Sequence, residues 1–416
     1  MDEQRKSESE LVPALRFEGF TDPWEQRKLG EIAHRVTRKN EEGASDLPLT
    51  ISAQHGLVDQ RDFFGSQVAS RDMRGYYLLE KGEFAYNKST SGDSPWGAVK
   101  RLARYEKGCL STLYICFGLD VGDPSFLVTY YETNRWHKGI RLIAAEGARN
   151  HGLLNIAPRD FFETELTLPG EIEEQSRIGA LFARLDSLIA LHQRKYEKLK
   201  TVKQSLLEKM FPKEGEDVPE LRFEGFTDPW EQRKLGELFA KGGSGGTPTA
   251  TEPSYYNGEI PFLGIADIED RYIDSTAKSL TEDGLNNSAA WVVPSGAICL
   301  AMYASVGKVG ICELDLATSQ AFYNMVFDSQ ALRDYVYARL DKADANAEWE
   351  PLISTGTQAN LNAEKVKGFQ MAVPCCEEAD LVGSFFRGLD SLIALHQREL
   401  EILKNLKKAL LEKMFV

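Results

Sequence analysis

Leu15–Glu31 reads LRFEGFTDPWEQRKLGE, and Leu221–Glu237 repeats that stretch letter for letter. A second identical pair follows, because Leu185–Arg194 and Leu389–Arg398 both read LDSLIALHQR. Each of these later segments continues into a tail that ends in LLEKMF. A repeat period of about 200 residues indicates a duplicated domain, since the repeats of a solenoid span only about 20–50 residues.

The chain therefore divides into two cassettes, each with a constant head, a variable middle and a constant helical tail. We predict a flexible lead-in at 1–14, a first variable domain at 15–170 with its head at 15–31, a spacer helix at 171–214, a second variable domain at 215–377 with its head at 221–237, and a spacer helix at 378–416. The aromatic residues of the head are interpreted as packing anchors for each variable domain.

The two variable middles contain short apolar and aromatic runs separated by glycine, such as FAYN at 84–87 and AICLAMY at 297–303. Runs of this kind bounded by turn residues are typical of β-strands. Gly242–Pro248, which reads GGSGGTP, is interpreted as a flexible opening to the second middle. The two middles have similar lengths and share weak sequence similarities. This indicates one fold used twice with different surface residues.

The helical tails show apolar residues at sevenfold spacing with charged residues between them, a pattern typical of long coiled-coil helices. One such helix cannot bury its own stripe, so we expect the two to pack against each other. The predicted seam contains Leu181, Leu185, Leu188, His192, Leu199, Val202 and Leu206 in the first helix and Leu389, Leu392, His396, Leu403, Leu406 and Leu410 in the second. The fold class is thus α+β, with two strand-rich mixed α/β domains, two long antiparallel coiled-coil helices and an internal pseudo-two-fold duplication.

The two seam histidines are predicted to be hydrogen-bonded or partly exposed core residues. They show no Cys or carboxylate partners at the spacing of a zinc site, so no metal is predicted. The six cysteines likewise lack CxxC spacing and are interpreted as inert thiols in a reducing cytoplasm.

Sequence motifs for catalysis and membrane insertion are missing. No run of 18 apolar residues occurs, the start lacks the apolar region of a signal peptide, and there is no GxGxxG, GxSxG or HExxH. Tyr303–Lys308 ends like a P-loop but lacks its first glycine. We therefore predict a cytoplasmic protein with no catalytic residues and no cofactor of its own.

Polar and basic clusters in the variable middles are candidates for contacts to phosphates and base edges. They comprise Lys88, Ser89, Thr90, Lys100, Arg101, Arg104, Arg135 and Lys138 in the first domain and Ser305, Lys308, Thr318 and Gln320 in the second. An ordinary solvated surface is the alternative interpretation of each cluster. Residues 32–155 hold 16 Lys and Arg against 14 Asp and Glu, whereas residues 238–380 hold 9 against 20. The second domain must therefore keep its acids away from any nucleic acid, or rely on a basic partner.

The duplicated head, the two different middles and the LDSLIALHQR…LLEKMF helices resemble the specificity subunit of Type I restriction–modification enzymes. The stretches FAYNKS at 84–89, GGTP at 245–248 and YYNGEIPFL at 255–263 are also similar to that family. The resemblance implies two target recognition domains that read the halves of a bipartite double-stranded DNA sequence. It further implies an antiparallel helical spacer, two modification (methyltransferase) subunits that bind S-adenosylmethionine, and restriction subunits with ATP- and Mg-dependent activity. This chain would carry none of that catalysis.

The layout itself favours an asymmetric target, because the two middles differ. A helix from Leu181 to Phe211 spans roughly 46 Å, a little over one turn of DNA, which suits two readers on one face of the duplex. The net charge of −14 predicts weak DNA binding by the chain alone. Three other interpretations stay open: a coiled-coil scaffold with two protein-binding domains, an acidic DNA mimic that inhibits such enzymes, and an independent enzyme.

Overall fold

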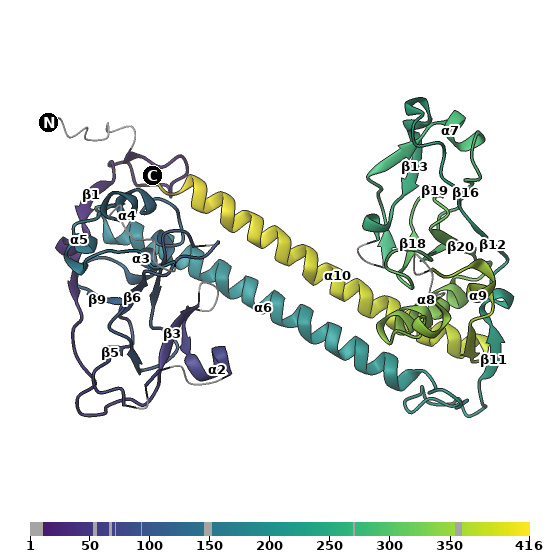
Figure 1. The fold of residues 1–416 in the computed structure, drawn as a ribbon, viewed down its shortest axis with the longest axis horizontal. Helices are drawn as coiled ribbons and strands as arrows, with labels where there is room; N and C mark the ends of the chain where they lie inside the picture. Colours follow the sequence, from purple (N-terminus) through teal and green to yellow (C-terminus); the bar gives the residue numbers. More distant parts are fainter. Residues whose placement is uncertain are drawn as a thin grey trace. The chain divides into compact units, whose positions relative to one another are not determined.

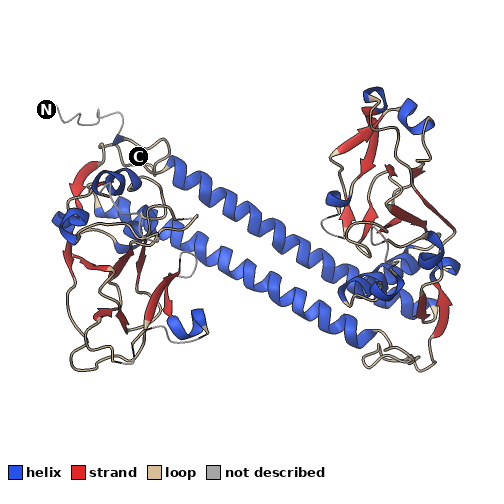
Figure 2. Cartoon of the chain, in the orientation of Figure 1, coloured by secondary structure: helices blue, strands red, loops and turns tan. Residues whose placement is uncertain are grey.

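The fold is described from a computed structural model of the chain, for residues 11–52, 56–65, 69–70, 72–92, 94–144, 152–268, 271–353 and 360–416. Most of the predicted lead-in at 1–14 lies outside these residues. The chain forms two compact units, unit 1 from Met1–Leu191 with Glu401–Val416 and unit 2 from His192–Leu400. Each unit combines a strand-rich body with a stretch of both long helices, α6 (Ile172–Met210) and α10 (Cys376–Lys413) (Figures 1 and 2).

Unit 1 is built around one antiparallel four-stranded sheet and three strand pairs. The sheet has the order β2 (Ala33–Arg35), β9 (Ile115–Leu119), β6 (Phe84–Asn87), β7 (Ala98–Arg101). The pairs are β1 (Glu25–Lys28) with β10 (Glu165–Leu168), β3 (Leu49–Ser52) with β4 (Gly56–Asp59), and β5 (Tyr77–Glu80) with β8 (Lys107–Leu110). Short helices complete it: α1 (Leu29–Ile32), α2 (Gln60–Phe64), α3 (Pro124–Tyr130), α4 (His137–Ile143) and α5 (Pro158–Phe162).

Unit 2 repeats this plan. Its main sheet has the order β12 (Lys241–Ser244), β20 (Phe322–Val326), β17 (Ile298–Ala301), β18 (Val309–Cys312), β14 (Tyr272–Ile273). A second sheet has the order β15 (Lys278–Leu280), β13 (Tyr256–Leu263), β19 (Leu316–Thr318), β16 (Val292–Val293), and β11 (Glu231–Lys234) pairs with β21 (Gln370–Val373). Its helices are α7 (Glu282–Asn286), α8 (Gln330–Ala345) and α9 (Ala363–Lys367). Four strands of the main sheet follow the same order as in unit 1, so the predicted duplication of one fold is confirmed.

The identical heads and tails contact each other in both units. In unit 1 the Leu15 N–H donates to the Lys413 carbonyl, and in unit 2 the Leu221 N–H donates to the Lys209 carbonyl. The buried head tryptophans pack on the tail phenylalanines at ring-centroid distances of 5.9 Å for Trp24 with Phe415 and 6.1 Å for Trp230 with Phe211.

A bidentate ion pair then ties each head to the first turn of a long helix. Arg16 donates to the buried Glu174 at 2.6 and 2.8 Å, and Arg222 donates to the buried Glu378 at 2.7 and 2.8 Å. The same set of contacts therefore links the constant head, the end of one long helix and the start of the other in both units.

A glycine on each long helix lets the strand-rich body that precedes the helix in the chain approach the helix backbone. A Cβ on Gly179 of α6 would lie 2.6 Å from the Phe126 nitrogen at the start of α3. A Cβ on Gly383 of α10 would lie 2.7 Å from the Tyr335 nitrogen in α8. Both contacts are shorter than any side chain tolerates, so each body packs on its helix at a glycine.

The Gly383→Ala variant should therefore lower the free energy of unfolding by about 1–3 kcal/mol, because backbone atoms must move to admit the methyl group. Gly388→Ala in the same helix is the matched control, since an added Cβ there meets nothing within 4 Å. That variant should raise stability by roughly 0.5–1 kcal/mol through helix propensity. Urea denaturation of the full chain measures both, and equal effects of the two substitutions would contradict the close approach at Gly383.

The helix segments run antiparallel within each unit, as predicted, but the second row of the seam is different. Val202, Leu392 and Leu406 are exposed at 38%, 48% and 45%, so their predicted place in the seam is wrong. The row three residues after the Leu185–His192–Leu199 row is mixed, since Leu181, Leu188 and Glu399 are half-buried. The row four residues after the Leu185–His192–Leu199 row is buried or half-buried throughout. It contains Phe182, Ile189, Tyr196, Lys203 and Met210 along the first helix and Phe386, Ile393, Leu400, Lys407 and Met414 along the second.

From the sequence, Ile189 and Tyr196 of this row are expected to widen the apolar stripe, but Lys203 and Lys407 hide the rest of the row. Each of these lysines is neutralised by acids that are far away in the sequence. The Lys203 ammonium lies 2.6 Å from Asp341 of α8 and 2.5 Å from Asp390 of α10. The Lys407 ammonium lies 2.7 Å from Glu132 and 2.5 Å from Asp186 of α6. Burial by itself would lower the pKa of both lysines, but the carboxylates outweigh it and raise each pKa above the ordinary value. In each unit a lysine of one helix therefore joins the other helix to the strand-rich body.

The glycine-rich opening of the second middle is not a flexible loop in the structure. β12 includes Gly242 and Gly243 and pairs antiparallel with β20. A Cβ on the following Gly245 would lie 2.0 Å from the Thr318 carbonyl oxygen. The glycines serve close backbone packing, which a sequence reading confuses with flexibility.

Within the described residues, no helix combines the length and the apolar character needed to span a membrane.

Candidate nucleic-acid interface

The Lys88–Thr90 stretch of unit 1 follows β6 and is held by the segment at 152–154. The Thr90 N–H and hydroxyl both donate to the Gly152 carbonyl, and the Lys88 carbonyl accepts from the Leu154 N–H. Ser89 is exposed and Lys88 is half-buried, and burial lowers the pKa of the Lys88 ammonium. Partial burial disfavours the charged form of the Lys88 ammonium. A phosphate oxygen beside Lys88 would stabilise that charge and offset the cost of burial.

The structure brings part of the 100–104 cluster next to the 134–138 cluster. Lys100 of β7 lines a hollow of about 340 Å³ together with Asn134 and His137. Arg101 is half-buried on the same strand, and Arg104 is exposed beside the Tyr105 ring at 5.5 Å. These residues give unit 1 a basic edge with amide and imidazole groups beside it.

The other two basic candidates of unit 1 lie at the end of α10. Arg135 donates to the Glu412 carbonyl at 3.1 Å, so it helps to satisfy the last turn of that helix. Lys138 of α4 is exposed and lines the same hollow as Arg135. The contact to Glu412 gives Arg135 a structural role, whatever else it binds.

In unit 2 the four candidates separate. Ser305 is exposed and lines a hollow with Tyr303 and Trp349, whereas the half-buried Lys308 lines a different cavity with Arg271. Gln320 is exposed and accepts from the Thr247 hydroxyl at 2.6 Å. Thr318 is fully buried in β19 and accepts from the Asn324 amide at 2.7 Å, so its predicted contact to DNA is wrong.

Backbone strain marks the 303–308 loop of unit 2. Ala304 and Ser305 have φ angles of 36° and 56°, in the left-handed region that non-glycine residues rarely occupy. Strain of this kind persists where the surrounding structure enforces it, and it clusters at functional loops. Tyr303 begins this loop and lines the hollow, although sequence reasoning did not include it among the candidate contacts. The left-handed conformation could not be read from an Ala-Ser pair.

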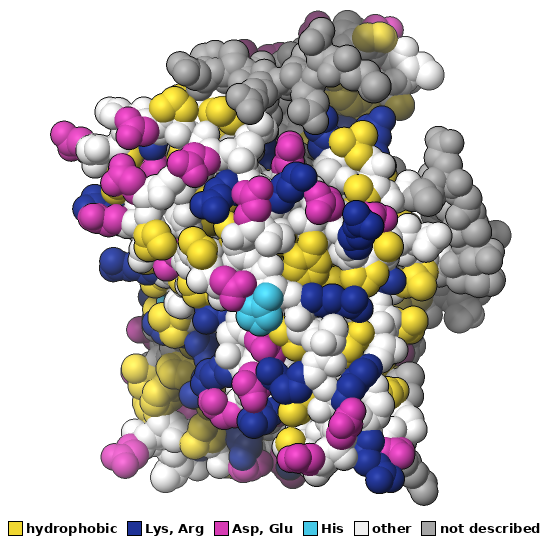
Figure 3. All heavy atoms as spheres, turned by 90° about the vertical axis from the view of Figure 1, so that its left-hand side faces the viewer, with side chains coloured by type: hydrophobic (Ala, Val, Ile, Leu, Met, Phe, Trp, Pro, Cys, Tyr) yellow, Lys and Arg dark blue, Asp and Glu magenta, His cyan; other side chains and the backbone are white. Residues whose placement is uncertain are grey.

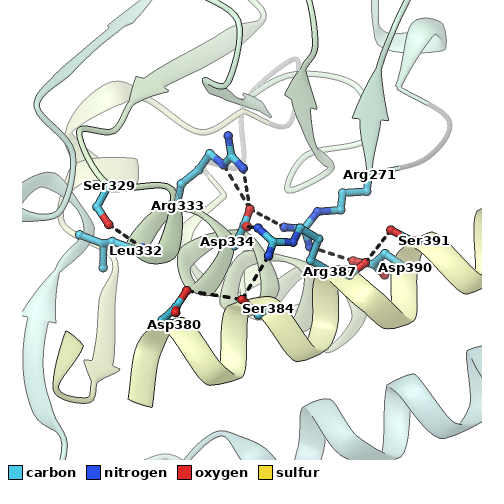
Figure 4. A network of polar contacts seen from close by, with 10 residues as sticks. All are labelled: Arg271, Ser329, Leu332, Arg333, Asp334, Asp380, Ser384, Arg387, Asp390 and Ser391. Atoms are coloured by element: carbon cyan, nitrogen blue, oxygen red, sulfur yellow. Dashed lines mark hydrogen bonds and ion pairs between the residues drawn. The ribbon is translucent and has the colours of Figure 1, made fainter. Parts of the chain in front are cut away.

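Most arginines of the unit 2 body point inward. Three of them converge on the buried Asp334 at the start of α8 (Figure 4). Arg271 donates to it at 2.7 Å, Arg333 at 2.9 Å, and Arg387 of α10 at 2.6 Å. Arg271 also donates to Asp390 at 2.9 Å and lies over the Tyr337 ring at 4.3 Å. These ion pairs hold the body on its helix and leave Arg271 and Arg333 little exposed for contacts to phosphates.

The buried acids account for part of the negative charge of unit 2. Asp334, Glu378 and Asp390 are all buried and paired with arginine or lysine. Unit 1 shows a different balance on the face drawn in Figure 3, where Lys and Arg side chains are interspersed with acids rather than gathered in one patch. Neither arrangement resembles the single basic stripe of an autonomous DNA-binding domain.

Comparison with known proteins shows which families this chain is similar to. Residues 227–405 match the model of the "Type I restriction modification DNA specificity domain". The MjaIX specificity subunit of Methanocaldococcus jannaschii is 27% identical over 191 residues, which cover 45% of this chain and 44% of that one. The HindI specificity subunit of Haemophilus influenzae is 25% identical over 150 residues, which cover 36% of this chain and 32% of that one. Each alignment spans less than two thirds of the relative.

The fold extends over the whole chain. The crystal structure of the S subunit of a Type I restriction–modification system from M. genitalium aligns with a TM-score of 0.60 at 16% identity, covering 97% of this chain and 99% of that one. The likeness concerns the fold, which has two duplicated α+β units on antiparallel helix segments, with different loops on a constant framework. By its matched residues and its relatives, the chain is similar to the specificity subunits of Type I restriction–modification systems.

Proposed function

We propose that this chain selects the DNA target of a Type I restriction–modification complex, with each unit reading one half of a split, asymmetric sequence. The observation that carries this proposal is the repetition of one sheet order on identical heads and tails, while the exposed loops differ. A constant framework with two different reading surfaces is what two independent half-sites require. The helix α6, about 58 Å long at 1.5 Å per residue, would set the gap between them.

Catalysis would come from partners. Specificity subunits of this family are non-catalytic, and the acid–base pairs described above are engaged with one another inside the fold. Two modification subunits would bind S-adenosylmethionine and methylate adenine, and restriction subunits would use ATP and Mg. The constant heads and helices, the same in both units, offer equivalent docking surfaces for two copies of one partner.

The inward-facing arginines of unit 2 favour a shared DNA interface. Phosphate contacts dominate the affinity of DNA-binding proteins, and a body with few outward cations supplies few of them. A partner with a basic channel would supply the rest. The alternative of a DNA mimic is disfavoured by the buried, paired positions of Asp334, Glu378 and Asp390, because a mimic displays its acids on the surface.

The purified chain alone is expected to bind DNA weakly at physiological salt, with a Kd in the range of about 10⁻⁴–10⁻⁶ M that is typical of non-specific binding. Addition of the cognate modification subunit should tighten binding by at least about 10³-fold for DNA that carries the target. Fluorescence anisotropy with target and scrambled duplexes measures both states. Tight, sequence-specific binding by the chain alone would contradict the shared interface, and a stable complex without DNA binding would favour a protein scaffold.

A further inference from the structure

Three side chains with metal-ligating atoms converge between the two long helices in unit 2. His192 lies on α6, and His396 and Glu399 lie one turn apart on α10. The two Nδ1 atoms are 3.1 Å apart, and Glu399 Oε2 lies 2.9 Å from His192 Nδ1 and 3.2 Å from His396 Nδ1. The three atoms form a nearly equilateral triangle.

Protons cannot satisfy all three sides of this triangle. A carboxylate oxygen only accepts, and each Nδ1 is either one donor or one acceptor. If both nitrogens carry a proton, two N–H groups face each other across the Nδ1···Nδ1 side. If only one does, the other nitrogen directs a lone pair at the carboxylate oxygen. With Glu399 ionised, one side therefore stays repulsive whichever nitrogens carry protons, whereas one cation that accepts all three lone pairs satisfies every side.

The triangle also has the size of one face of a metal tetrahedron. At bond lengths of about 2.0–2.1 Å, neighbouring ligand atoms of a tetrahedral zinc ion lie roughly 3.3 Å apart. The observed separations of 2.9–3.2 Å need only a small expansion to reach that geometry. Imidazole and carboxylate ligands together suit zinc and its divalent neighbours.

Burial fits an open metal site. The two histidine side chains are each 15% exposed, and the Glu399 side chain is 40% exposed. The ligands are thus held by the helix pair while one side of the triangle faces solvent. A water molecule could complete a four-coordinate site from that side.

We propose that His192, His396 and Glu399 bind one divalent transition-metal ion, with zinc favoured, and that the ion cross-links α6 to α10. The duplication supplies the two histidines at equivalent positions, and a single difference between the copies supplies the carboxylate. The residue of α6 that corresponds to Glu399 is Lys195, so the duplicated position offers no carboxylate, and the described part of the chain holds one such group. Metal binding would hold the two helices in one register at this level.

The test is metal uptake by the full chain after treatment with a chelator. The wild-type chain should bind one equivalent of Co²⁺ with the visible absorption of a tetrahedral site and without the near-ultraviolet band of thiolate ligands. Zn²⁺ should displace the Co²⁺ and raise the unfolding midpoint. Glu399→Gln and His396→Asn should weaken Zn²⁺ binding by on the order of 100-fold, since loss of even outer contacts to metal ligands costs 10–100-fold.

Two controls separate this site from other sources of binding. Glu401→Gln removes an exposed carboxylate on the same helix and should leave Zn²⁺ affinity unchanged. Cys375 and Cys376 are exposed free thiols that could bind zinc, so the Cys375→Ser/Cys376→Ser variant should keep its single equivalent. Circular dichroism without metal shows that each variant is folded. Absence of stoichiometric uptake, uptake unchanged in the His396→Asn/Glu399→Gln variant, or uptake lost with the two cysteines would overturn the proposal.

Discussion

Exchanging residues 32–170 for the corresponding segment of a Type I specificity subunit is expected, on the proposed function, to replace one half of the methylated target and leave the other half unaltered. The described strands of the four-stranded sheet of unit 1 and the residues of its hydrophobic core all lie outside the 238–380 region. The two strand-rich bodies are therefore structurally independent. Each mismatched base pair costs about 1–3 kcal/mol, so methylation at the original half-site should fall to background when several positions change.

The exchange must preserve the contacts between the strand-rich body of unit 1 and the two long helices. The donor segment needs an acid at the position of Glu132 to pair with Lys407, and a close helix start like that of α3 opposite Gly179. The reciprocal exchange of residues 238–368 serves as the control and should alter only the other half. If either exchange changed both halves, the two units would not read independently.

Asp334→Ala should destabilise the fold by about 3–5 kcal/mol, the typical cost of leaving a buried charge without its partner. This carboxylate neutralises three arginines, and Arg271 has a side chain only 3% exposed. After the substitution Arg271 would retain Asp390 alone, which already pairs with Lys203. The equivalent position of unit 1 is Ser125, so the network is a feature of unit 2.

Urea denaturation followed by circular dichroism measures this loss. Asp380→Ala, which removes an exposed acid from α10, provides the comparison and should change stability by less than about 0.5 kcal/mol. A similar small effect of Asp334→Ala would show that the three arginines find solvent or other acids, and that the network does not hold the body on α10.

The duplication and the helices could be predicted because they depend on local, repeated signals. The identical LDSLIALHQR stretches and the sevenfold spacing of Leu185 and Leu389 are visible without any tertiary information. Strand-rich middles could also be predicted from runs such as FAYN at 84–87, which forms β6.

The remaining features depend on contacts between distant residues. Lys203 and Lys407 occupy seam positions, although a pattern of apolar residues would not predict a lysine there. Their charges are neutralised by acids of α8, of α10 and of the residues after α3, which are distant in the sequence. Thr318 looked like a polar loop residue, but β19 is an inner strand of its sheet. Glu399 was overlooked as a partner of His192 because the two lie on different helices.

The measurement that tests the central claim most directly is modified-base sequencing of DNA from cells that express this chain with its cognate modification subunit. A split, asymmetric sequence with methyladenine in both halves, absent when this chain is omitted, is the predicted result. Methylation of a continuous or palindromic sequence, or no methylation despite a stable complex of the two proteins, would contradict it.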